Sequence, residues 1–330
     1  MPTRDRQTDS PATVLHRLVV GRAEVGLRLD AFLARRFGRG RGLIRGRVRA
    51  EVQDASGHRL KWSHRLRAGE ELWVPGVARP EPDVEVRFAV LHADDFVVAV
   101  DKGPGAPVHP VRSFRKRTVL TGLREALGDP TLKPAHRLDR ETSGVLVFGR
   151  GRENTARLMA MFRARAVRKR YLAVVCGEPG FDEREIDLCL GRDPLFAYRV
   201  RMRPDPLGQP ARTRLRVLRR LAGRALVAAE PQTGRQHQIR VHLAAIGHPV
   251  LGDPLYQLGG QPYIDRIRDA LDEDRAALLG HSRLALHAER LELTHPQTGA
   301  PMALHAPLPE DLTGLLADVL DEGYGTPTVR

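Results

Sequence analysis

The chain has 330 residues, with 54 lysines and arginines against 40 aspartates and glutamates, a formal net charge of +14 and a pI of about 10.7. This length predicts a main body with a smaller appended unit. The positive charge, nearly all of it arginine, favours a polyanionic partner, above all nucleic acid. Cys176 and Cys189 are too few for a disulfide framework or a structural zinc site, and no apolar stretch is long enough to cross a bilayer. We therefore expect a cytoplasmic protein.

The first 75 residues predict a lead-in and a small lobe. Residues 1–15 are polar and read as a flexible lead-in, and residues 16–75 form the lobe. GLRLDAFLARRFG is a basic amphipathic helix with Arg28, Arg35 and Arg36 on its outer face. GLIRGRVRAEV predicts a second helical piece, and KWSHRLRAGEELWVP alternates like a strand.

The order helix, helix, hairpin with basic outer faces resembles the small RNA-binding alpha-L motif named after ribosomal small-subunit protein four. The core of that motif is replaced here by GRVRAEVQDASG. The resemblance implies that Arg28, Arg35 and Arg36 contact RNA. An ordinary small α+β lobe is the alternative.

The remaining chain predicts one large α+β domain. Residues 76–84 are rich in proline and read as a linker, so the main domain covers residues 85–330. Many strand-like segments with few intervening helices indicate a central mixed, mostly antiparallel sheet flanked by helices, and not a doubly wound parallel sheet. The expected helices cover Thr118–Leu127, a stretch around Leu158 capped by Asn154, Thr233–Gly247, part of the polar excursion 257–280, and Leu312–Leu320.

The segment HRLDRETSG, from His136 to Gly144, is the most informative stretch. It places Asp139 between Arg137 and Arg140, just before the strand-like run Val145–Phe148. Neighbouring positive charge lowers a carboxyl pKa, and the small residues after Asp139 allow a tight turn that presents it to a cleft. A solvated charge string on a surface loop is the alternative.

Two further segments carry candidate site residues. Tyr171 begins a strand after a basic cluster, and an aromatic ring beside arginines is suited to stacking on an extruded base. The alternative is a half-buried strand tyrosine. On the expected helix after Thr233, Gln236 and Arg240 are four residues apart and share a face, so the arginine can project toward a cleft. The basic cluster comprises Arg163, Arg165, Arg168, Lys169 and Arg170.

Other kinds of site lack their residues in this sequence. The histidines do not have the spacing of metal ligands, and there is neither a GxxxxGK[ST] loop nor a glycine-rich dinucleotide turn after a strand. The candidate residues therefore predict a site that needs no metal and no cofactor.

Several long motifs in one order resemble the RluA family of pseudouridine synthases. They are DKGPGAPVHP, HRLDRETSG, KRYLAVVCG, PQTGRQHQIRVHLAAIGHPVLGDPLY and RLALHAERLELTHP. The resemblance implies that Asp139 is the catalytic aspartate, that Tyr171 stacks on the target base and that Arg240 is the ion-pair partner of Asp139. Arg137 would occupy the gap left by the flipped nucleotide. Further RNA contacts are expected at Arg140, Arg168, Lys169, Arg170, Arg235, Gln236 and His237.

The resemblance implies an enzyme that isomerises uridine in structured RNA, with ribosomal RNA favoured over transfer RNA, and we expect a monomer. A carboxylate can attack the anomeric carbon or act as a base at C2′, with Tyr171 as the other proton acceptor, and the sequence leaves these routes open. Two alternatives have different functions. One is an inactive RNA-binding or ribosome assembly factor. The other is a base-releasing glycosidase, which pairs two acids and would have only Glu141 as its second.

Overall fold

The computed structural model describes residues 15–37, 52–75, 81–111, 114–196, 200–268 and 271–317. The chain divides into two compact units, Met1–Pro80 and Glu81–Arg330, which are described separately. Across these described stretches, no helix has both the length and the apolar character to span a bilayer.

The first unit is a small three-stranded antiparallel sheet with a helix packed on it. Apolar side chains of the helix, Leu29, Phe32 and Leu33, are buried together with Leu72 and Val74 of the sheet. The elements are β1 (Leu15–Val19), η1 (Arg22–Glu24), α1 (Leu29–Phe37), β2 (Gln53–Asp54) and β3 (Glu71–Pro75), with strand order β1-β3-β2.

The structure corrects two expectations for this unit. A strand, β1, begins at Leu15, where the lead-in was expected to end. Residues 61–70 form turns instead of a strand, and the side chains of His64 and Glu70 close them with a 2.6 Å contact. Most of the predicted second helix, over residues 42–52, lies outside the described residues.

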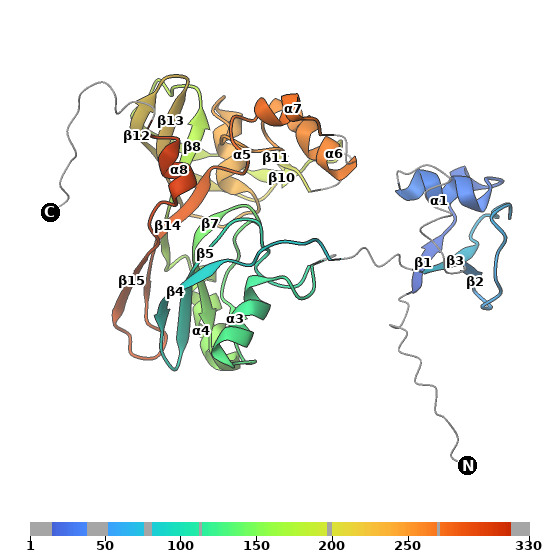
Figure 1. Ribbon diagram of the computed structural model, residues 1–330, viewed down its shortest axis with the longest axis horizontal. Coiled ribbons are helices and arrows are strands. Elements are labelled where there is room, and N and C mark those ends of the chain that lie inside the picture. Colours follow the sequence, from blue (N-terminus) through green and yellow to red (C-terminus); the bar gives the residue numbers. More distant parts are fainter. Residues whose placement is uncertain are drawn as a thin grey trace, which may run out of the picture. The chain divides into compact units, whose positions relative to one another are not determined.

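The second unit is built on a ten-stranded mixed sheet (Figure 1). The strand order is β4-β5-β7-β14-β8-β13-β12-β9, and β6 and β15 pair with β7 and β14. This is the expected mixed, mostly antiparallel α+β architecture. The strands are β4 (Phe88–Ala93), β5 (Val97–Lys102), β6 (Lys133–Pro134), β7 (Ser143–Gly149), β8 (Arg168–Cys176), β9 (Glu183–Asp187), β12 (Arg212–Leu221), β13 (Arg224–Pro231), β14 (Leu286–Thr294) and β15 (Pro301–His305).

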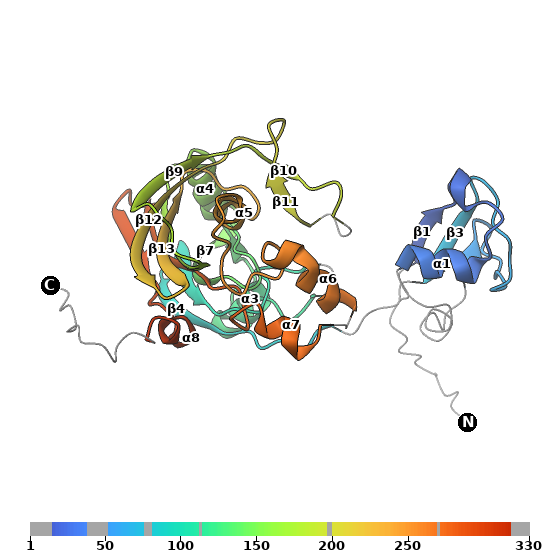
Figure 2. The same ribbon diagram turned by 90° about the horizontal axis from the view of Figure 1, so that it is seen from above.

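The remaining elements lie around this sheet. A separate hairpin pairs β10 with β11. Figure 2 shows β9, β12 and β13 together at one end of the sheet. The elements are β10 (Leu190–Arg192), β11 (Met202–Pro204), α3 (Val119–Leu127), α4 (Gly151–Arg163), α5 (Gln238–Ala245), η2 (Leu258–Gly260), α6 (Gln261–Arg268), α7 (Glu273–Ala277) and α8 (Glu310–Gly314).

Strands β5 and β7 are buried on both faces. Leu146 and Phe148 of β7 lie in one apolar cluster with residues of α3. Val145 and Val147 lie in another, with Leu158 of α4. Because successive side chains of a strand point to opposite faces, a helix on each side explains why the whole of β7 is apolar and buried.

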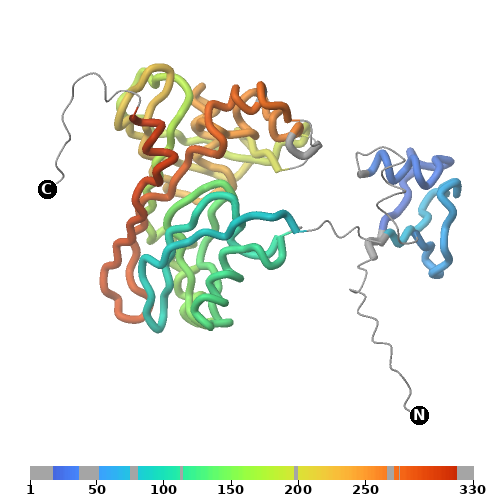
Figure 3. The backbone as a smooth tube through the Cα atoms, viewed as in Figure 1, coloured from blue at the N-terminus to red at the C-terminus, as the bar shows by residue number. Residues whose placement is uncertain are grey.

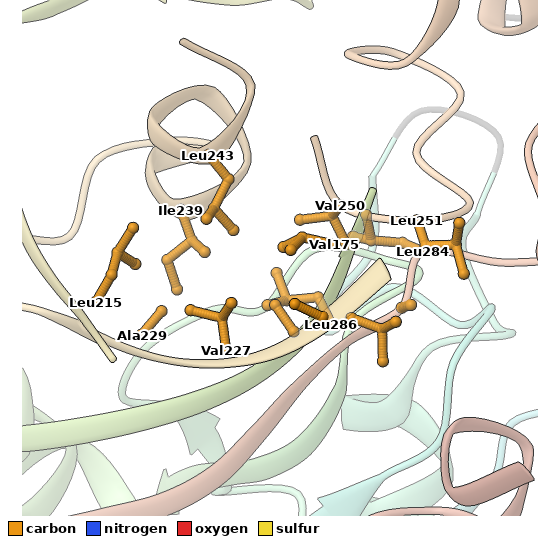
Figure 4. Packing of buried hydrophobic residues seen from close by; sticks show 14 of the residues in the cluster. Val175, Leu215, Val227, Ala229, Ile239, Leu243, Val250, Leu251, Leu284 and Leu286 are labelled. Carbon is orange, nitrogen blue, oxygen red and sulfur yellow. The ribbon is translucent and has the colours of Figure 1, made fainter. Parts of the chain in front are cut away.

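Helix α5 packs on the other half of the sheet. Ile239 and Leu243 point from the helix toward Leu215, Val227 and Ala229 of β12 and β13 (Figure 4). The helix begins at Gln238 and not near Thr233 as expected, because His237 has a left-handed backbone conformation (φ 56°) that breaks the helical run. Helix α4 also begins at a different residue from the one expected. It starts at Gly151, so Asn154 lies in its first turn, where it donates to the carbonyl of Arg150 and does not act as the cap.

The C-terminal part of the chain completes the centre of the sheet. Figure 3 shows the orange and red segment of β14 and β15 returning beside the early strand β4. Strand β14 pairs with β7 in parallel, His287 opposite Ser143 and Ala288 opposite Gly144, and Ser143 Oγ lies 2.9 Å from His287 Nδ1. Gly144 has a φ of 109°, and a Cβ there would collide with the carbonyl oxygen of Ala288. Only glycine allows this close approach.

Gly144→Ala should therefore lower the free energy of unfolding by about 3 kcal/mol, because it adds a backbone collision to the cost of a left-handed alanine. Gly128→Ala is the matched control. Gly128 also has a positive φ, of 62°, but a Cβ there meets nothing within 4 Å, so we expect a loss of about 1 kcal/mol, the cost of a left-handed alanine alone. Urea denaturation of both variants measures the difference, and equal losses would contradict the packing argument.

Candidate active site

A cavity of about 710 Å³ opens beside the turn that precedes β7. It is lined by this turn, by the end of α4, by β8 and by residues 231–240. Among the described residues that line it, Asp139 is the single carboxylate. The cationic side chains around it are Arg137, Arg163, Arg165, Lys169, Arg235 and Arg240.

Arg240 joins two carboxylates beneath this cavity. Its Nη1 donates to Oδ2 of Asp139 at 2.7 Å, while its Nε and Nη2 donate to the two oxygens of Asp253 at 2.7 and 2.8 Å. The side chain of Asp253 is fully buried and that of Arg240 is 9% exposed, whereas that of Asp139 is 24% exposed. Asp253 therefore fixes the guanidinium, and the guanidinium fixes the one carboxylate that reaches the cavity.

Asp139 is ionised in this arrangement. Burial acts to raise its pKa, but the His237 ring, the Arg240 charge and the Arg240 hydrogen bond outweigh it and hold the pKa below its ordinary value. Only Oδ2 is engaged by Arg240, and among the described residues no hydrogen bond reaches Oδ1. Oδ1 is thus left without a protein partner among these residues.

A buried lysine holds the turn that carries Asp139. Lys102 is fully buried at the end of β5, and its Nζ donates to the carbonyls of Gly103, Arg140 and Thr142 at 2.7, 2.9 and 2.9 Å. The backbone N–H of Thr142 closes the turn by donating to the carbonyl of Asp139. Burial lowers the pKa of Lys102 to about 7. The lysine positions the turn without lining the cavity.

His237 faces Asp139 as a neutral ring. Its Nε2 is 3.9 Å from Oδ2 of Asp139, and its Nδ1 is 2.9 Å from the hydroxyl of Tyr256. That hydroxyl already accepts from the backbone N–H of Met202, so its own proton is free to be donated to Nδ1. Burial, reinforced by the charge of Arg240, lowers the pKa of His237 to about 4. Tyr256 therefore leaves the ring proton on Nε2, directed at Asp139.

Tyr171 lines the same cavity from β8. Burial and the charge of Asp139 raise the pKa of its phenol above the ordinary value. The hydroxyl is therefore protonated near neutral pH, and its ring offers an apolar face next to Leu286 and Ile239 at the cavity wall.

The structure gathers some of the predicted residues and separates others. Gln236 lines the cavity with Arg240, but it precedes α5 and so does not share a helical face with it. Arg140 points elsewhere, to Glu141 at 2.7 Å and the Phe114 ring, and does not line the cavity. Arg28, Arg35 and Arg36 belong to the first unit, where Arg28 contacts Asp30 and Arg36 lies 3.7 Å from Glu24.

Comparisons with known proteins show the family to which the chain belongs. The profile of the RNA pseudouridylate synthase family matches residues 96–245, which include Asp139, Tyr171 and Arg240. "Ribosomal large subunit pseudouridine synthase D" of Xanthomonas campestris is 33% identical over 96% of both chains. The chain belongs to the RluA family of pseudouridine synthases.

Other members of the family support this assignment. "Ribosomal large subunit pseudouridine synthase C" of Escherichia coli is 32% identical over 93% of this chain and 96% of its own. The solved structure of "Human RNA Pseudouridylate Synthase Domain Containing 1" superposes with a TM-score of 0.55, at 26% identity over 69% of this chain and 86% of that one. Pseudouridine synthases convert uridine in RNA to pseudouridine, which is the activity of this chain.

Sequence reasoning missed three residues of this candidate site, Lys102, Asp253 and Tyr256. All three stand in the motifs that carry the family resemblance, within DKGPG and GDPLY. Their charge and position alone gave no indication of the carbonyls, guanidinium or imidazole that they contact, because the turns that bring these partners together lie between them in the sequence and follow no periodic pattern.

The low pKa of His237 predicts acid sensitivity of the fold. Because the folded state holds this proton more weakly than the unfolded chain, whose histidine has an ordinary pKa of 6.5, stability is present above pH 6.5 and is lost as the pH falls toward 4. The loss reaches up to about 3 kcal/mol. His237→Asn should flatten the pH dependence of the unfolding free energy in this window, measured by urea denaturation. His109→Asn, outside the cavity, should not, and an unchanged slope in the His237 variant would contradict the neutral ring.

Proposed function

We propose that this protein isomerises specific uridines of large-subunit ribosomal RNA, acting in the cytoplasm as a monomer without a cofactor. The names of its relatives from X. campestris and E. coli support this substrate. The observation that carries the proposal is the ionised Asp139, held by Arg240 with one oxygen free toward a cavity ringed by cations. The negative phosphates of an RNA strand complement the charge of these cations, and the cavity can accept a flipped base.

The single carboxylate is sufficient for the isomerisation. In one route Oδ1 attacks C1′ of the uridine, the N1–C1′ bond breaks and its electron pair leaves with the uracil. In the other, Oδ1 removes the C2′ proton as that bond breaks. In both, the uracil turns within the cavity and C5 bonds to C1′. At this step the Oδ1–C1′ bond breaks in the first route, and in the second the proton held by Oδ1 returns to C2′. The proton of C5 is then lost and N1 gains one. No atom is gained or lost, so no co-reactant is required.

Tyr171 and Arg137 are proposed to hold the extruded nucleotide. Tyr171 presents its ring at the wall of the cavity, and stacking on such a ring is available to any base. Arg137 is exposed at the cavity edge, where it can fill the space that the base leaves in the RNA. This filling offsets a few kcal/mol of lost stacking.

Asp139→Asn tests the proposal. The amide is nearly isosteric but has no nucleophilic or basic oxygen, so pseudouridine formation on an unmodified large-subunit rRNA transcript should fall by at least about 10⁴-fold. Pseudouridine is mapped by chemical labelling and primer extension. Circular dichroism and RNA binding serve as controls for folding. Turnover near the wild-type rate would contradict the role of Asp139, and release of free uracil would indicate a glycosidase instead.

Tyr171→Phe separates stacking from proton transfer. The ring remains and only the hydroxyl is lost, so RNA affinity should stay close to that of the wild type. If the phenol accepts the C5 proton, the single-turnover rate falls by about 10²-fold or more; if its role is stacking alone, the rate changes little. Because the raised pKa keeps the hydroxyl protonated, we expect the smaller effect. Tyr171→Ala should lose affinity in either case.

A further inference from the structure

A second cavity adjoins the active site. It has a volume of about 550 Å³ and shares Arg165, Lys169, Pro231 and Gln232 with the first cavity. The two cavities adjoin at these four residues and are together called the groove, and Asp139 lines the first cavity alone. The other residues of the second cavity are Val167, Arg168, Arg170, Glu230, Arg290 and Glu292.

The cations of this groove differ in whether they have acidic partners. Arg170 makes a bidentate ion pair with Glu289 at 2.6 and 2.7 Å, and Arg168 lies 3.8 Å from Glu292. Within the described part of the chain, neither Arg165 nor Lys169 has a carboxylate partner. In the second cavity, where Arg290 also has a partner in Glu292, the cations without a carboxylate partner are therefore Arg165 and Lys169, the two that it shares with the first cavity.

Arg165 occupies a backbone position that favours glycine. It follows the C-cap of α4 with a φ of 58°, and its N–H donates to the carbonyl of Phe162. Helices commonly end with glycine in this conformation, because a Cβ is strained there. An arginine at this position thus accepts backbone strain and places a guanidinium at the junction.

Lys169 adds a second cation at the same point. It is half-buried, and its Nζ donates to the carbonyl of Thr233 at 3.3 Å. Burial and the charge of Arg165 lower its pKa. Two positive charges close together in a cavity repel each other, and an anion bound between them offsets this repulsion. Lys169 also lies on the same strand face as Tyr171, about 7 Å along β8, a distance that one nucleotide can span.

We propose that Arg165 and Lys169 form a subsite for the backbone phosphate adjacent to the flipped uridine, and that the RNA strand continues from there into the second cavity. This inference rests on the proposed function, because it takes the base to occupy the first cavity. It assigns phosphate binding to Arg165 and Lys169, while Arg168 and Arg170 form the wall of the groove and retain their acidic partners.

The test measures binding of a short oligouridylate by fluorescence anisotropy over a range of salt concentrations. Arg165→Gly relieves the backbone strain while removing the guanidinium, so the variant should unfold at the same temperature as the wild type or higher. Lys169→Met removes the charge and keeps the stem. Each should weaken binding about tenfold and reduce the salt dependence by about one ion per contact. The fold-loss of affinity in the double variant should be smaller than the product of the fold-losses in the two single variants, because both residues hold the same phosphate.

Arg152→Ala is the matched control, since Arg152 is exposed on α4 and lines neither cavity. Its affinity should equal that of the wild type. If Arg165→Gly and Lys169→Met also bind like Arg152→Ala, or if their effects simply multiply, the subsite is wrong. The binding assay requires no turnover. Failure of the wild type to form pseudouridine would therefore overturn the proposed function, while the binding assay would still show whether Arg165 and Lys169 bind a phosphate.

Discussion

The site depends on a buried arginine that lies between two carboxylates. A buried charge is costly unless it is paired and hydrogen-bonded. Here Arg240 has both, because Asp253 takes two of its donor groups and Asp139 a third. One carboxylate in excess remains, and it is the one that reaches the cavity. The ion pair with Arg240 thus keeps Asp139 charged in a partly buried site, and it engages only Oδ2 and leaves Oδ1 without a partner from Arg240. Asp253 also accepts from the backbone of Leu255 and Tyr256, so the same residue orders the segment that orients His237.

Backbone strain is concentrated around this site. Among the described non-glycine residues, Arg165, His237 and Leu258 have a positive φ, and the first two line the cavity. Such conformations persist only where the surrounding structure holds them. At His237 the left-handed turn ends the approach from β13 and starts α5, which directs the imidazole at Asp139 and brings Arg240 one turn further into the protein. The left-handed residues Arg165 and His237 therefore set both the course of the backbone around the cavity and the direction of side chains that line it.

The sequence predicts the parts of this molecule that depend on local pattern. The apolar run Val145–Phe148, the helix that Thr118 precedes, and the grouping of Asp139, Tyr171 and Arg240 follow from periodicity and from family motifs. It does not predict contacts that the fold makes between distant segments. Lys102 reads as one more basic residue until the carbonyls of a turn nearly forty residues later surround it. Likewise, the helical periodicity around Gln236 extends past His237, because a left-handed residue other than glycine leaves no mark in the pattern.

The parallel contact between β7 and β14 has a consequence for synthesis of the chain. The turn that carries Asp139 leads into Ser143 and Gly144, whose partners His287 and Ala288 lie about 140 residues later. A ribosome must therefore translate most of the domain before the strand end that follows this turn gains its partner. Emerging fragments already carry the basic segments that attract RNA, but they lack the finished reactive centre. The pairing of Ser143 and Gly144 is complete only once β14 has been synthesised.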